Sequence, residues 1–269
     1  MKAVVLAAGR GTRMRKTAAS DGLTPGQSAM ADSGLKAMMP FGGRPFLDYV
    51  LRAIADAGCT EACLVVAPEH DLVRDYYTRT RRPQRIGVTF VVQREPKGTA
   101  DALLAARSFV EGDPFLAMNS DNYYPPDVLR TLAALDGQGL PAFSREGLLR
   151  DGHIEPGRVR DYALLRIAPD GALEDIVEKP DEATARAMER DAFVSMNCWR
   201  FDARVFDACQ RVPPSERGEL ELPAAVRFGI HRMQMRFVTF RVDAAVLDLS
   251  RRADVPAVAR RLATLEGEP

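Results

Sequence analysis

Short apolar runs alternate with amphipathic segments along the first half of the chain. Residues 3–8 form an uncharged run with two valines, and similar runs occupy residues 63–67, 88–93 and 114–119. Runs this short, bounded by turn residues, are typical of strands buried on both faces of a parallel sheet. Between them, residues 45–57 show the periodicity of an amphipathic helix. The pattern therefore predicts an α/β fold with a mostly parallel sheet flanked by helices.

The second half of the chain is patterned less regularly. Residues 162–180 alternate on either side of Pro169-Asp170-Gly171, which predicts a β-hairpin. Residues 140–161 are rich in Gly, Arg and Asp, and we expect this segment to cross an edge of the sheet. Further strands are expected at residues 193–201 and 236–242, and further helices at residues 25–32, 69–79, 182–190 and 253–265.

Composition limits the classes of protein to consider. The chain has 269 residues, 46% of them hydrophobic, with 37 basic and 37 acidic residues. Without a long linker or repeat, this ordinary globular composition predicts one domain over residues 1–269. A formal net charge of zero argues against a nucleic-acid-binding surface. No apolar stretch approaches the ~20 residues that cross a bilayer, so we expect no membrane partner and a cytoplasmic location. Homo-oligomerisation stays open.

The cysteines and histidines show no metal-binding spacing. Cys59, Cys63, Cys198 and Cys209 lack the Cys-x-x-Cys pattern, which predicts reduced, buried thiols in a reducing compartment. The three histidines are scattered, without a His-Glu-x-x-His pattern, and are expected to be structural or surface residues. Candidate chemistry must therefore come from other residues.

A glycine-rich turn with cationic side chains follows the first apolar run. Gly9 and Gly11 end the predicted strand, and Arg10 and Arg13 stand within the turn. Glycines at the carboxyl end of a strand let the backbone approach a ligand, and loop N–H groups and arginines attract phosphates. A dinucleotide fingerprint would need glycine at Met14, and a Walker A loop would need Gly-Lys-Ser/Thr, so this is a phosphate loop of another kind. The alternative is an ordinary strand-to-helix turn with solvated arginines.

Polar residues also follow the third and fourth predicted strands. Gln93 precedes a turn at Gly98-Thr99, and its amide can donate to and accept from the edge of a base. The alternative is a simple helix start capped by Thr99. Asp121 follows the fourth strand, where a carboxylate points into the ligand crevice of a parallel sheet and suits Mg²⁺ bound to phosphates. The alternative is that Asp121 and Asn122 only form a turn.

These motifs resemble those of one enzyme family. Leu6-Ala7-Ala8-Gly9-Arg10-Gly11-Thr12-Arg13-Met14 is similar to the signature loop of the sugar-1-phosphate nucleotidyltransferases. Lys36, which precedes Met38-Met39-Pro40, resembles the second signature of the family, and Glu178-Lys179-Pro180 resembles its sugar-binding motif. The resemblance covers nearly the whole chain. It implies a Rossmann-like, mixed, mostly parallel sheet of the nucleotide-diphospho-sugar transferase type.

The resemblance also implies a role for individual residues. The catalytic residues implied are Arg13, Lys36 and Lys179, and the implied ligands of a Mg²⁺ cofactor are Asp121 and Asp248. The nucleotide-binding residues implied are Ala7, Ala8, Gly9, Gly11, Thr12, Gln93, Pro96, Gly98 and Thr99. The sugar-binding residues implied are Asn122, Tyr162, Glu178 and Asn197, in a sugar-binding part at residues 140–200.

The reaction implied joins a nucleoside triphosphate (NTP) to a sugar-1-phosphate and releases pyrophosphate. The likeness of residues 98–103 to uridylyl- and thymidylyltransferases favours UTP or dTTP with a hexose-1-phosphate. GTP is the runner-up, because guanine also offers a donor beside an acceptor. Another phosphate monoester, such as phosphocholine, is the alternative acceptor.

Some positions depart from the pattern of the family. Residues 16–35 form an insertion of small and polar residues, which we expect to act as a mobile lid over the triphosphate. Ala163 stands where the family has glycine, Trp199 is bulky, and Val246 replaces an aromatic residue. These departures motivate a second hypothesis, a regulatory nucleotide- or sugar-binding homologue without catalysis. The implied catalytic and metal-binding residues are all retained, which favours the enzyme.

Overall fold

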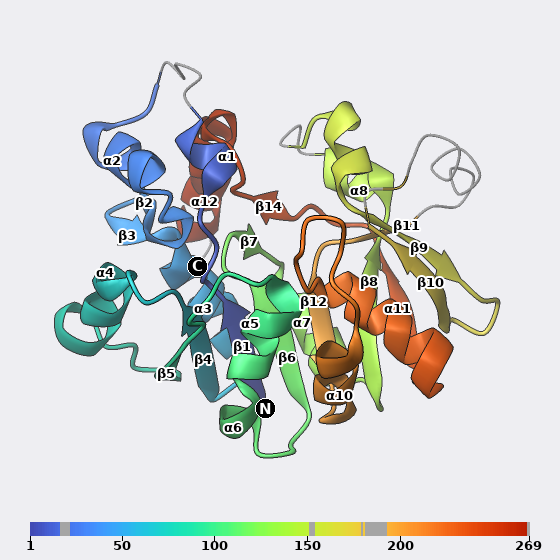
Figure 1. The fold of residues 1–269 in the computed structure, drawn as a ribbon. Coiled ribbons are helices and arrows are strands. Elements are labelled where there is room, and N and C mark those ends of the chain that lie inside the picture. The colour runs from blue at the N-terminus through green and yellow to red at the C-terminus, as the bar shows by residue number, and fades with distance from the viewer. Residues whose placement is uncertain (17–21, 151–153, 179, 181–192, 268–269) are drawn as a thin grey trace.

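One mixed sheet forms the centre of the molecule, with helices on both faces (Figure 1). The computed structural model describes residues 1–16, 22–150, 154–178, 180 and 193–267, and ten strands of this part form the sheet. In sheet order the strands are β10 (Leu173–Val177), β9 (Ala163–Ile167), β11 (Phe193–Ser195), β8 (Gln138–Phe143), β12 (Cys198–Phe201), β6 (Phe115–Asn119), β1 (Lys2–Leu6), β4 (Glu61–Val66) and β5 (Gly87–Val92), and β13 (Phe237–Val242) pairs with β8. The predicted fold class is confirmed.

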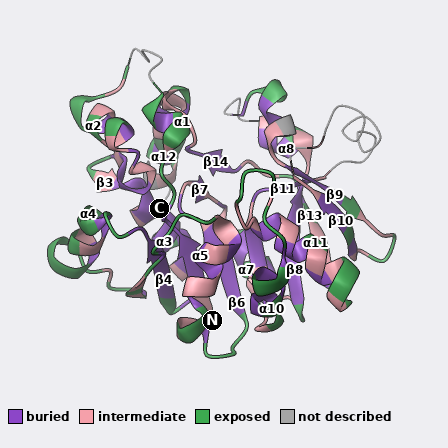
Figure 2. Cartoon of the chain, viewed as in Figure 1, coloured by how far each residue is buried: buried purple, intermediate pink, exposed green. Residues whose placement is uncertain are grey.

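The parallel half of the sheet consists of β6, β1, β4 and β5, as the apolar runs predicted. Val4 and Val5 of β1 are both fully buried, and they belong to hydrophobic clusters on opposite faces of the sheet. A strand covered on both faces needs apolar side chains at every position, which is why β1 has no polar alternation. Figure 2 shows the same burial across the central strands.

Helices pack on both faces through one apolar side each. The cluster that contains Val5 includes side chains of α3 (Phe46–Asp56), α7 (Pro126–Ala133) and α12 (Val255–Gly267). The cluster that contains Val4 includes side chains of α5 (Thr99–Ala105), α10 (Arg204–Arg211) and α11 (Leu222–Met233). Further elements are α1 (Thr12–Arg15), α2 (Pro25–Ser33), η1 (Lys36–Met38), β2 (Pro40–Phe41), β3 (Arg44–Pro45), α4 (Asp71–Asp75), η2 (Tyr76–Thr80), α6 (Arg107–Val110), α8 (Arg145–Leu149), η3 (Pro156–Asp161) and η4 (Arg252–Asp254).

Helix α2 begins and ends close to where the sequence predicted. The Gln27 N–H donates to Thr24 Oγ1 at 3.3 Å, and the Thr24 N–H donates to Gln27 Oε1 at 3.0 Å, which makes a capping box. Gly34 ends the helix in the left-handed conformation, with φ 78°. The predicted lid at residues 16–35 therefore contains a regular helix. Residues 17–21 of it lie outside the described residues, and its mobility stays a prediction.

The expectation for residues 140–161 is wrong at its start, because part of this segment is a central strand. Strand β8 lies between β11 and β12, and each of its residues is buried. A side chain at Gly139 would collide with the carbonyl oxygen of Val238 on β13, so the close pairing requires glycine. Gly139 and Pro141 conceal the strand in the sequence, because neither residue favours β-structure.

The expected single strand at residues 193–201 is two strands. Asn197 has φ 56°, which ends β11 and begins β12 beside a different neighbour, β6. Asparagine tolerates this left-handed conformation better than most residues. The predicted hairpin is confirmed, since β9 and β10 pair antiparallel. The helix expected at residues 69–79 is observed as α4 followed by the π-helical turn η2, whereas the helix expected at residues 182–190 lies outside the described residues.

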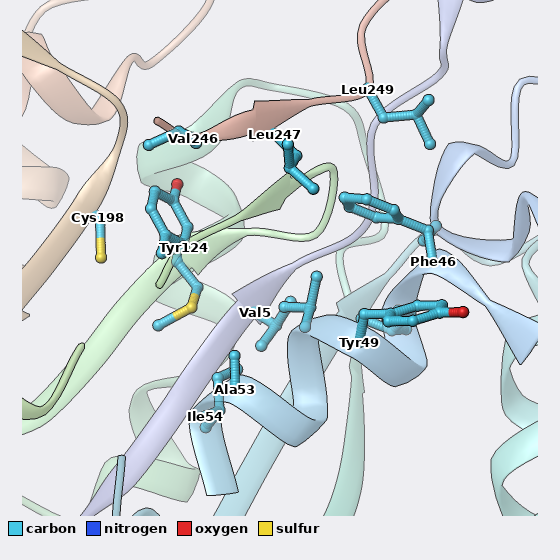
Figure 3. Packing of buried hydrophobic residues seen from close by; sticks show 14 of the residues in the cluster. Val5, Phe46, Tyr49, Ala53, Ile54, Tyr124, Cys198, Val246, Leu247 and Leu249 are labelled. Carbon is cyan, nitrogen blue, oxygen red and sulfur yellow. The ribbon is translucent and has the colours of Figure 1, made fainter. Parts of the chain in front are cut away.

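The C-terminal segment crosses the carboxyl ends of the parallel strands. Strand β14 (Leu247–Asp248) pairs antiparallel with β7 (Asn122–Tyr123), just after β6. Val246, Leu247 and Leu249 are buried, and Figure 3 shows them packed near Tyr124 and the α3 residue Phe46. This apolar contact places the backbone around residue 248 next to the end of β6.

The four cysteines are buried and free, as predicted. His70 is also buried, with 6% of its surface exposed, whereas His231 is exposed. Among the described residues, no helix is both long enough and apolar enough to cross a membrane.

Candidate active site

A cleft of about 400 Å³ lies at the carboxyl ends of β1, β4, β5 and β6. Open parallel sheets bind ligands at this edge. The predicted site residues that line the cleft are Ala7, Ala8, Gly9, Thr12, Lys36, Gln93, Pro96, Gly98, Thr99, Asp121, Glu178 and Asn197. Gly11, Arg13, Asn122, Tyr162 and Asp248 are described but do not line it, and Lys179 lies outside the described residues.

The glycine-rich loop enters the cleft directly from β1. The Ala7 N–H donates to the Val65 carbonyl at 2.8 Å, which extends the pairing of β1 with β4. Gly11 has φ +60°, and a Cβ there would collide with the carbonyl oxygen of Gly34. Gly11 is therefore needed for contact between two backbone segments. This contact holds the loop beside the segment that carries Lys36.

The arginines of this loop lie in different places. Arg10 lines the cleft and is exposed, whereas Arg13 lies on the outside of α1. The charge of Arg13 still reaches the cleft, since it acts on the pKa of Lys36 in the lowering direction. The motif thus supplies two positive charges near the cleft, but only Arg10 lines it.

Lys36 and Asp121 form an ion pair in the cleft. Lys36 begins the turn η1, and Asp121 lies two residues beyond β6. Lys36 Nζ donates to Asp121 Oδ2, and the two side chains are 19% and 18% exposed. Burial disfavours the charged amine, but the carboxylate of Asp121 outweighs burial and raises the pKa of Lys36. Lys36 is therefore a fixed cation at neutral pH.

The backbone of Asp248 lies next to that of Asp121, but the Asp248 carboxylate binds other residues. The Leu249 N–H donates to the Asp121 carbonyl at 2.8 Å, so β14 runs along the end of β6. Asp248 Oδ2 accepts from Arg158 Nη2 at 2.7 Å and from the Tyr162 hydroxyl at 2.6 Å. Its side chain is 4% exposed. Tyr162 is therefore hydrogen-bonded to Asp248, the second predicted metal ligand.

Arg158 connects two buried carboxylates. It also donates through Nη1 to Asp254, and only 8% of the Arg158 side chain is exposed. Asp248 Oδ1 accepts from the Ser250 hydroxyl at 2.6 Å, so both oxygens of Asp248 have partners. Burial opposes the charge of Arg158, but the two carboxylates outweigh burial and raise its pKa. Burial and the neighbouring Asp248 also raise the pKa of Tyr162.

Gln93 is buried under the turn that follows β5. Its Nε2 donates to the Gly98 carbonyl at 3.0 Å and to Asp101 Oδ2 at 2.7 Å. Because an ionised carboxylate only accepts hydrogen bonds, the nitrogen must face Asp101. Both N–H groups of the amide are thus used inside the protein, and Oε1 is the group that Gln93 can offer to a ligand.

The turn after β5 is held by the loop before α11. The Leu220 N–H donates to the Lys97 carbonyl at 2.6 Å. The Leu222 N–H donates to Thr99 Oγ1 at 2.8 Å, so Thr99 binds the first residue of α11 instead of capping its own helix. Gly98 has φ +108°, and a Cβ there would collide with the Leu220 backbone. Two distant segments therefore build this wall of the cleft together.

The predicted sugar-binding residues are only partly brought together. Glu178 and Asn197 line the cleft. A hydrogen bond holds the turn that carries Asn197, because the Tyr124 hydroxyl donates to the Met196 carbonyl at 2.6 Å. Lys179, the predicted partner of the sugar phosphate, lies outside the described residues. A place for Lys179 at this end of the cleft stays a prediction.

The unusual residues in the second half of the chain lie in the core. Trp199 is fully buried and stacks on Phe201, with ring centroids 5.5 Å apart. Cys198 and Ala163 are also buried, and neither lines the cleft. These departures from the family pattern therefore lie in the core and not among the residues that line the cleft.

Sequence reasoning missed several residues that line the cleft. His70 is one of them: its Nδ1 lies 3.1 Å from the Ala7 carbonyl, and burial lowers its pKa. It follows β4 as Asp121 follows β6, so the rule that found Asp121 also applies to His70. Arg217, Glu219 and Glu221 also line the cleft, and Arg217 pairs with both glutamates. None of these three was among the implied site residues, and they reach the cleft through the loop before α11.

Asp121 is the carboxylate best placed to bind a metal ion. Within the described part of the chain, no group of three or more His, Cys, Asp or Glu side chains could hold a metal by itself. Mg²⁺ commonly takes one or two carboxylates and completes its shell with water and substrate phosphates. Asp121 fits this role, because it lines the cleft and has hard oxygen donors. Asp248 does not line the cleft and both of its oxygens have partners in the protein, so its role as a second ligand stays a prediction.

Known proteins resemble the chain in sequence and in fold. Residues 2–246 match the model of the nucleotidyl transferase family. The bifunctional protein GlmU of Methanococcus vannielii is 25% identical over 227 residues, which cover 84% of this chain and 47% of GlmU. The UTP–glucose-1-phosphate uridylyltransferase AglF of Haloferax volcanii is 27% identical over 265 residues, which cover 97% of this chain and 96% of AglF. The chain thus spans about half the length of GlmU and nearly all of AglF.

The fold also matches solved structures. A crystal structure of UDP-glucose pyrophosphorylase with UDP-glucose aligns over 98% of both chains, with a TM-score of 0.73 and 18% sequence identity. At this identity the match concerns the fold alone. Because the family model spans most of the sequence, the chain belongs to the nucleotidyl transferase family, as its resemblance to the sugar-1-phosphate nucleotidyltransferases indicated.

Proposed function

We propose that the chain transfers a nucleotidyl group from UTP or dTTP to a hexose-1-phosphate and releases pyrophosphate. The observation that carries this proposal is the Lys36–Asp121 pair, in a cleft with the glycine-rich loop on one side and the Gln93 turn on the other. A half-buried cation and a candidate metal ligand thus lie between the glycine-rich loop and the Gln93 turn. AglF, named as a UTP–glucose-1-phosphate uridylyltransferase, supports this choice of substrates by its similarity over nearly the full length of both chains.

The chemistry needs charge neutralisation and alignment. An oxygen of the sugar phosphate attacks the α-phosphorus of the triphosphate, and the bond from the α-phosphorus to the pyrophosphate oxygen breaks. The second pKa of a phosphate group is ~6, so the nucleophile is ionised near neutral pH and no general base is required. Lys36 supplies a fixed positive charge that offsets the growing charge around the α-phosphate. Arg10 and Arg13 attract the triphosphate, and Lys179 remains the predicted contact of the sugar phosphate.

Asp121 would hold Mg²⁺ in this site. The bound ion would neutralise the triphosphate and polarise its phosphoryl oxygens. The end of β6 and the Leu249 N–H fix the backbone of Asp121, which keeps its carboxylate at the cleft. Asp248 remains the predicted second ligand. A cytoplasmic location and the oligomeric state also remain predictions.

Gln93 favours some bases over others. Its free Oε1 is an acceptor, which pairs with the N3–H of uracil or thymine. Cytosine and adenine present a bare ring nitrogen at the corresponding position, and an acceptor there repels the carbonyl oxygen. Guanine has an N1–H and keeps GTP as the runner-up. The single acceptor therefore supports UTP or dTTP over ATP and CTP.

Pyrophosphate release tests this proposal. The protein is assayed with Mg²⁺ and each of UTP, dTTP, GTP, ATP and CTP, against a panel of hexose-1-phosphates that also includes phosphocholine. We expect UTP or dTTP with a hexose-1-phosphate to give the highest kcat/KM. A dominant ATP or CTP product contradicts the base assignment, and turnover with phosphocholine alone contradicts the sugar. No release with any pair returns the non-catalytic hypothesis.

Two variants test the site itself. Lys36→Met and Asp121→Asn should each lower kcat about 10²–10³-fold, as expected for a group that stabilises transition-state charge. Lys97→Met is the matched control, because Lys97 is exposed and pairs with Glu95 outside the cleft. Circular dichroism confirms that each variant is folded. An Asp121→Asn variant with near-normal kcat would show that the metal assignment is wrong.

A further inference from the structure

A second hollow of about 410 Å³ lies between α3 and the loop before β5. It shares no lining residue with the cleft. Its rim carries five arginines: Arg44, Arg52, Arg81, Arg82 and Arg85. Because the whole chain is formally neutral, this is a local concentration of positive charge.

Carboxylates neutralise only part of this charge. Arg85 Nη1 lies 2.6 Å from Asp56 Oδ1, and Arg52 Nε lies 3.8 Å from the other oxygen of the same carboxylate. Arg81 Nε lies 3.6 Å from Asp48 Oδ2. Two carboxylates therefore serve three of the guanidinium groups.

The other two arginines, Arg44 and Arg82, have no ion-pair partner among the residues that the structure describes. Arg44 is half-buried, so solvent screens its charge less than it screens the charge of a fully exposed arginine. Five guanidinium groups against two carboxylates leave three positive charges around one hollow. Such an excess attracts an anion with more than one negative charge.

The floor of the hollow is apolar. Leu51, Tyr49 and Ile86 line it and are 3%, 6% and 4% exposed, and the Ala55 side chain adds to this surface. A ligand with a flat apolar face gains by removing that face from water against this floor, whereas inorganic phosphate has no such face. The arginine rim suits phosphate groups, because a planar guanidinium binds two phosphate oxygens at once. The two parts together match a molecule with a flat base and several phosphate charges.

We propose that this arginine-lined hollow binds a nucleoside di- or triphosphate, with the phosphates on the arginines and the base over the apolar floor. Its volume falls in the range of about 300–1,000 Å³ that is usual for small-molecule sites. Arg44 lies on β3, and the Phe46 N–H at the start of α3 donates to the Met39 carbonyl at 2.9 Å. The ligand therefore contacts the segment that continues from Lys36, although it binds outside the cleft.

Hydrogen exchange of the full chain, titrated with UTP, tests this site by its own local signal. We expect UTP to slow exchange at residues 81–87 and in α3. The double variant Arg82→Glu/Arg85→Glu should weaken this protection about ten-fold or more, since two charge-assisted contacts are lost. Protection of residues 7–12 and 93–99 in the cleft should remain. The cleft signal reports on the proposed function separately, so the two proposals can fail independently.

Matched controls separate a built site from general attraction to positive charge. Arg79→Glu/Arg130→Glu makes the same change of charge at exposed positions outside the hollow, and it should leave the protection intact. Pyrophosphate should protect residues 81–87 about ten-fold less tightly than UTP, because it leaves the apolar floor uncovered. Unchanged exchange at residues 81–87 with UTP, equal loss in the control variant, or equal protection by pyrophosphate would each overturn the proposal.

Discussion

At the scale of single residues, Arg158 determines which partners Asp248 has. Its guanidinium lies between Asp248 and Asp254, with all three side chains almost fully buried. Burial makes such a pair costly to form, but removing one partner costs more, because it leaves a buried charge without compensation. The free energy of folding should therefore depend strongly on Arg158, even though this residue lies outside the cleft.

We predict that Arg158→Met lowers the free energy of unfolding by about 3–5 kcal/mol. Urea denaturation measures the loss. The double variant Arg158→Met/Asp248→Asn should be more stable than Arg158→Met, because it removes one of the two buried carboxylates that lose the positive charge of Arg158. Arg130→Met is the control, since Arg130 forms an exposed pair with Asp127 on α7. Equal small losses for both arginines would contradict a buried network.

At the scale of elements, the wall at the Gln93 turn depends on contact between two loops. Gly98 permits this contact, since any side chain there would collide with Leu220. We predict that Gly98→Ala pushes the turn from its partner loop and raises KM for UTP about ten-fold or more. Steady-state kinetics measure the effect.

Gly112→Ala is the matched control for that prediction. Gly112 also has a left-handed φ, +90°, but a Cβ there would meet nothing within 4 Å. This variant carries the same backbone strain without the collision, so KM for UTP should stay at the wild-type value. An equal rise in KM in both variants would mean that backbone strain, and not the contact between the two loops, sets the affinity of the Gln93 turn for UTP.

A second link between elements is sensitive to pH. Asp175 of β10 binds Arg227 and His231 of α11, and its side chain is 7% exposed. Burial opposes its ionisation, but the hydrogen bond from His231, the charge of Arg227 and the Ile176 N–H outweigh burial and hold the pKa of Asp175 below the ordinary value of 3.8. A carboxyl with a depressed folded-state pKa contributes stability that is present above its unfolded pKa and is lost as the pH falls through the folded one.

We therefore predict that the melting temperature of the wild type falls as the pH decreases below about 4. Asp175→Asn should be less stable at neutral pH and should show a shallower decline in this acidic range. Glu174→Gln is the control, because Glu174 is half exposed and pairs only loosely, at 3.6 Å, with Arg166. Parallel pH profiles of wild type and Asp175→Asn would exclude this link as a source of acid sensitivity.

At the scale of the whole molecule, the four thiols report on both faces of the sheet. Cys59 and Cys198 belong to the hydrophobic cluster on one face, and Cys63 and Cys209 belong to the cluster on the other. Burial raises the pKa of Cys59 and of Cys63 to about 11 and that of Cys209 to about 12. Burial raises the pKa of Cys198 further. The native thiols should therefore be unreactive near neutral pH.

We predict that a thiol reagent at pH 8 labels none of the four cysteines in the native protein. If residues 1–269 form one cooperative domain, all four should become reactive over the same range of urea concentration. Mass spectrometry assigns the labelled positions, and Thr78→Cys provides an exposed thiol as the positive control. Labelling of one pair at clearly lower urea would show that the two faces unfold separately.

Local patterns were enough to predict the parallel half of the fold and its ligand edge. Buried parallel strands need continuous apolar runs, and the polar residues at their carboxyl ends must face the crevice. Asp121 and Gln93 were found in this way, and both line the cleft. The capping box of α2 and the free, buried thiols were likewise determined by residues close in sequence or by composition.

Tertiary structure decided what depends on distant partners. Strand β8 was hidden because Gly139 is explained only by the backbone of β13. The sequence predicted a base contact for Gln93, but Asp101 and the Gly98 carbonyl decide that only its oxygen is left for a ligand. Likewise, the family resemblance implied a metal-binding role for Asp248, but in the fold its carboxylate binds Arg158, which is far away along the chain. The sequence gives the type of each residue, whereas folding alone brings together the hydrogen-bond and ion-pair partners of its polar groups.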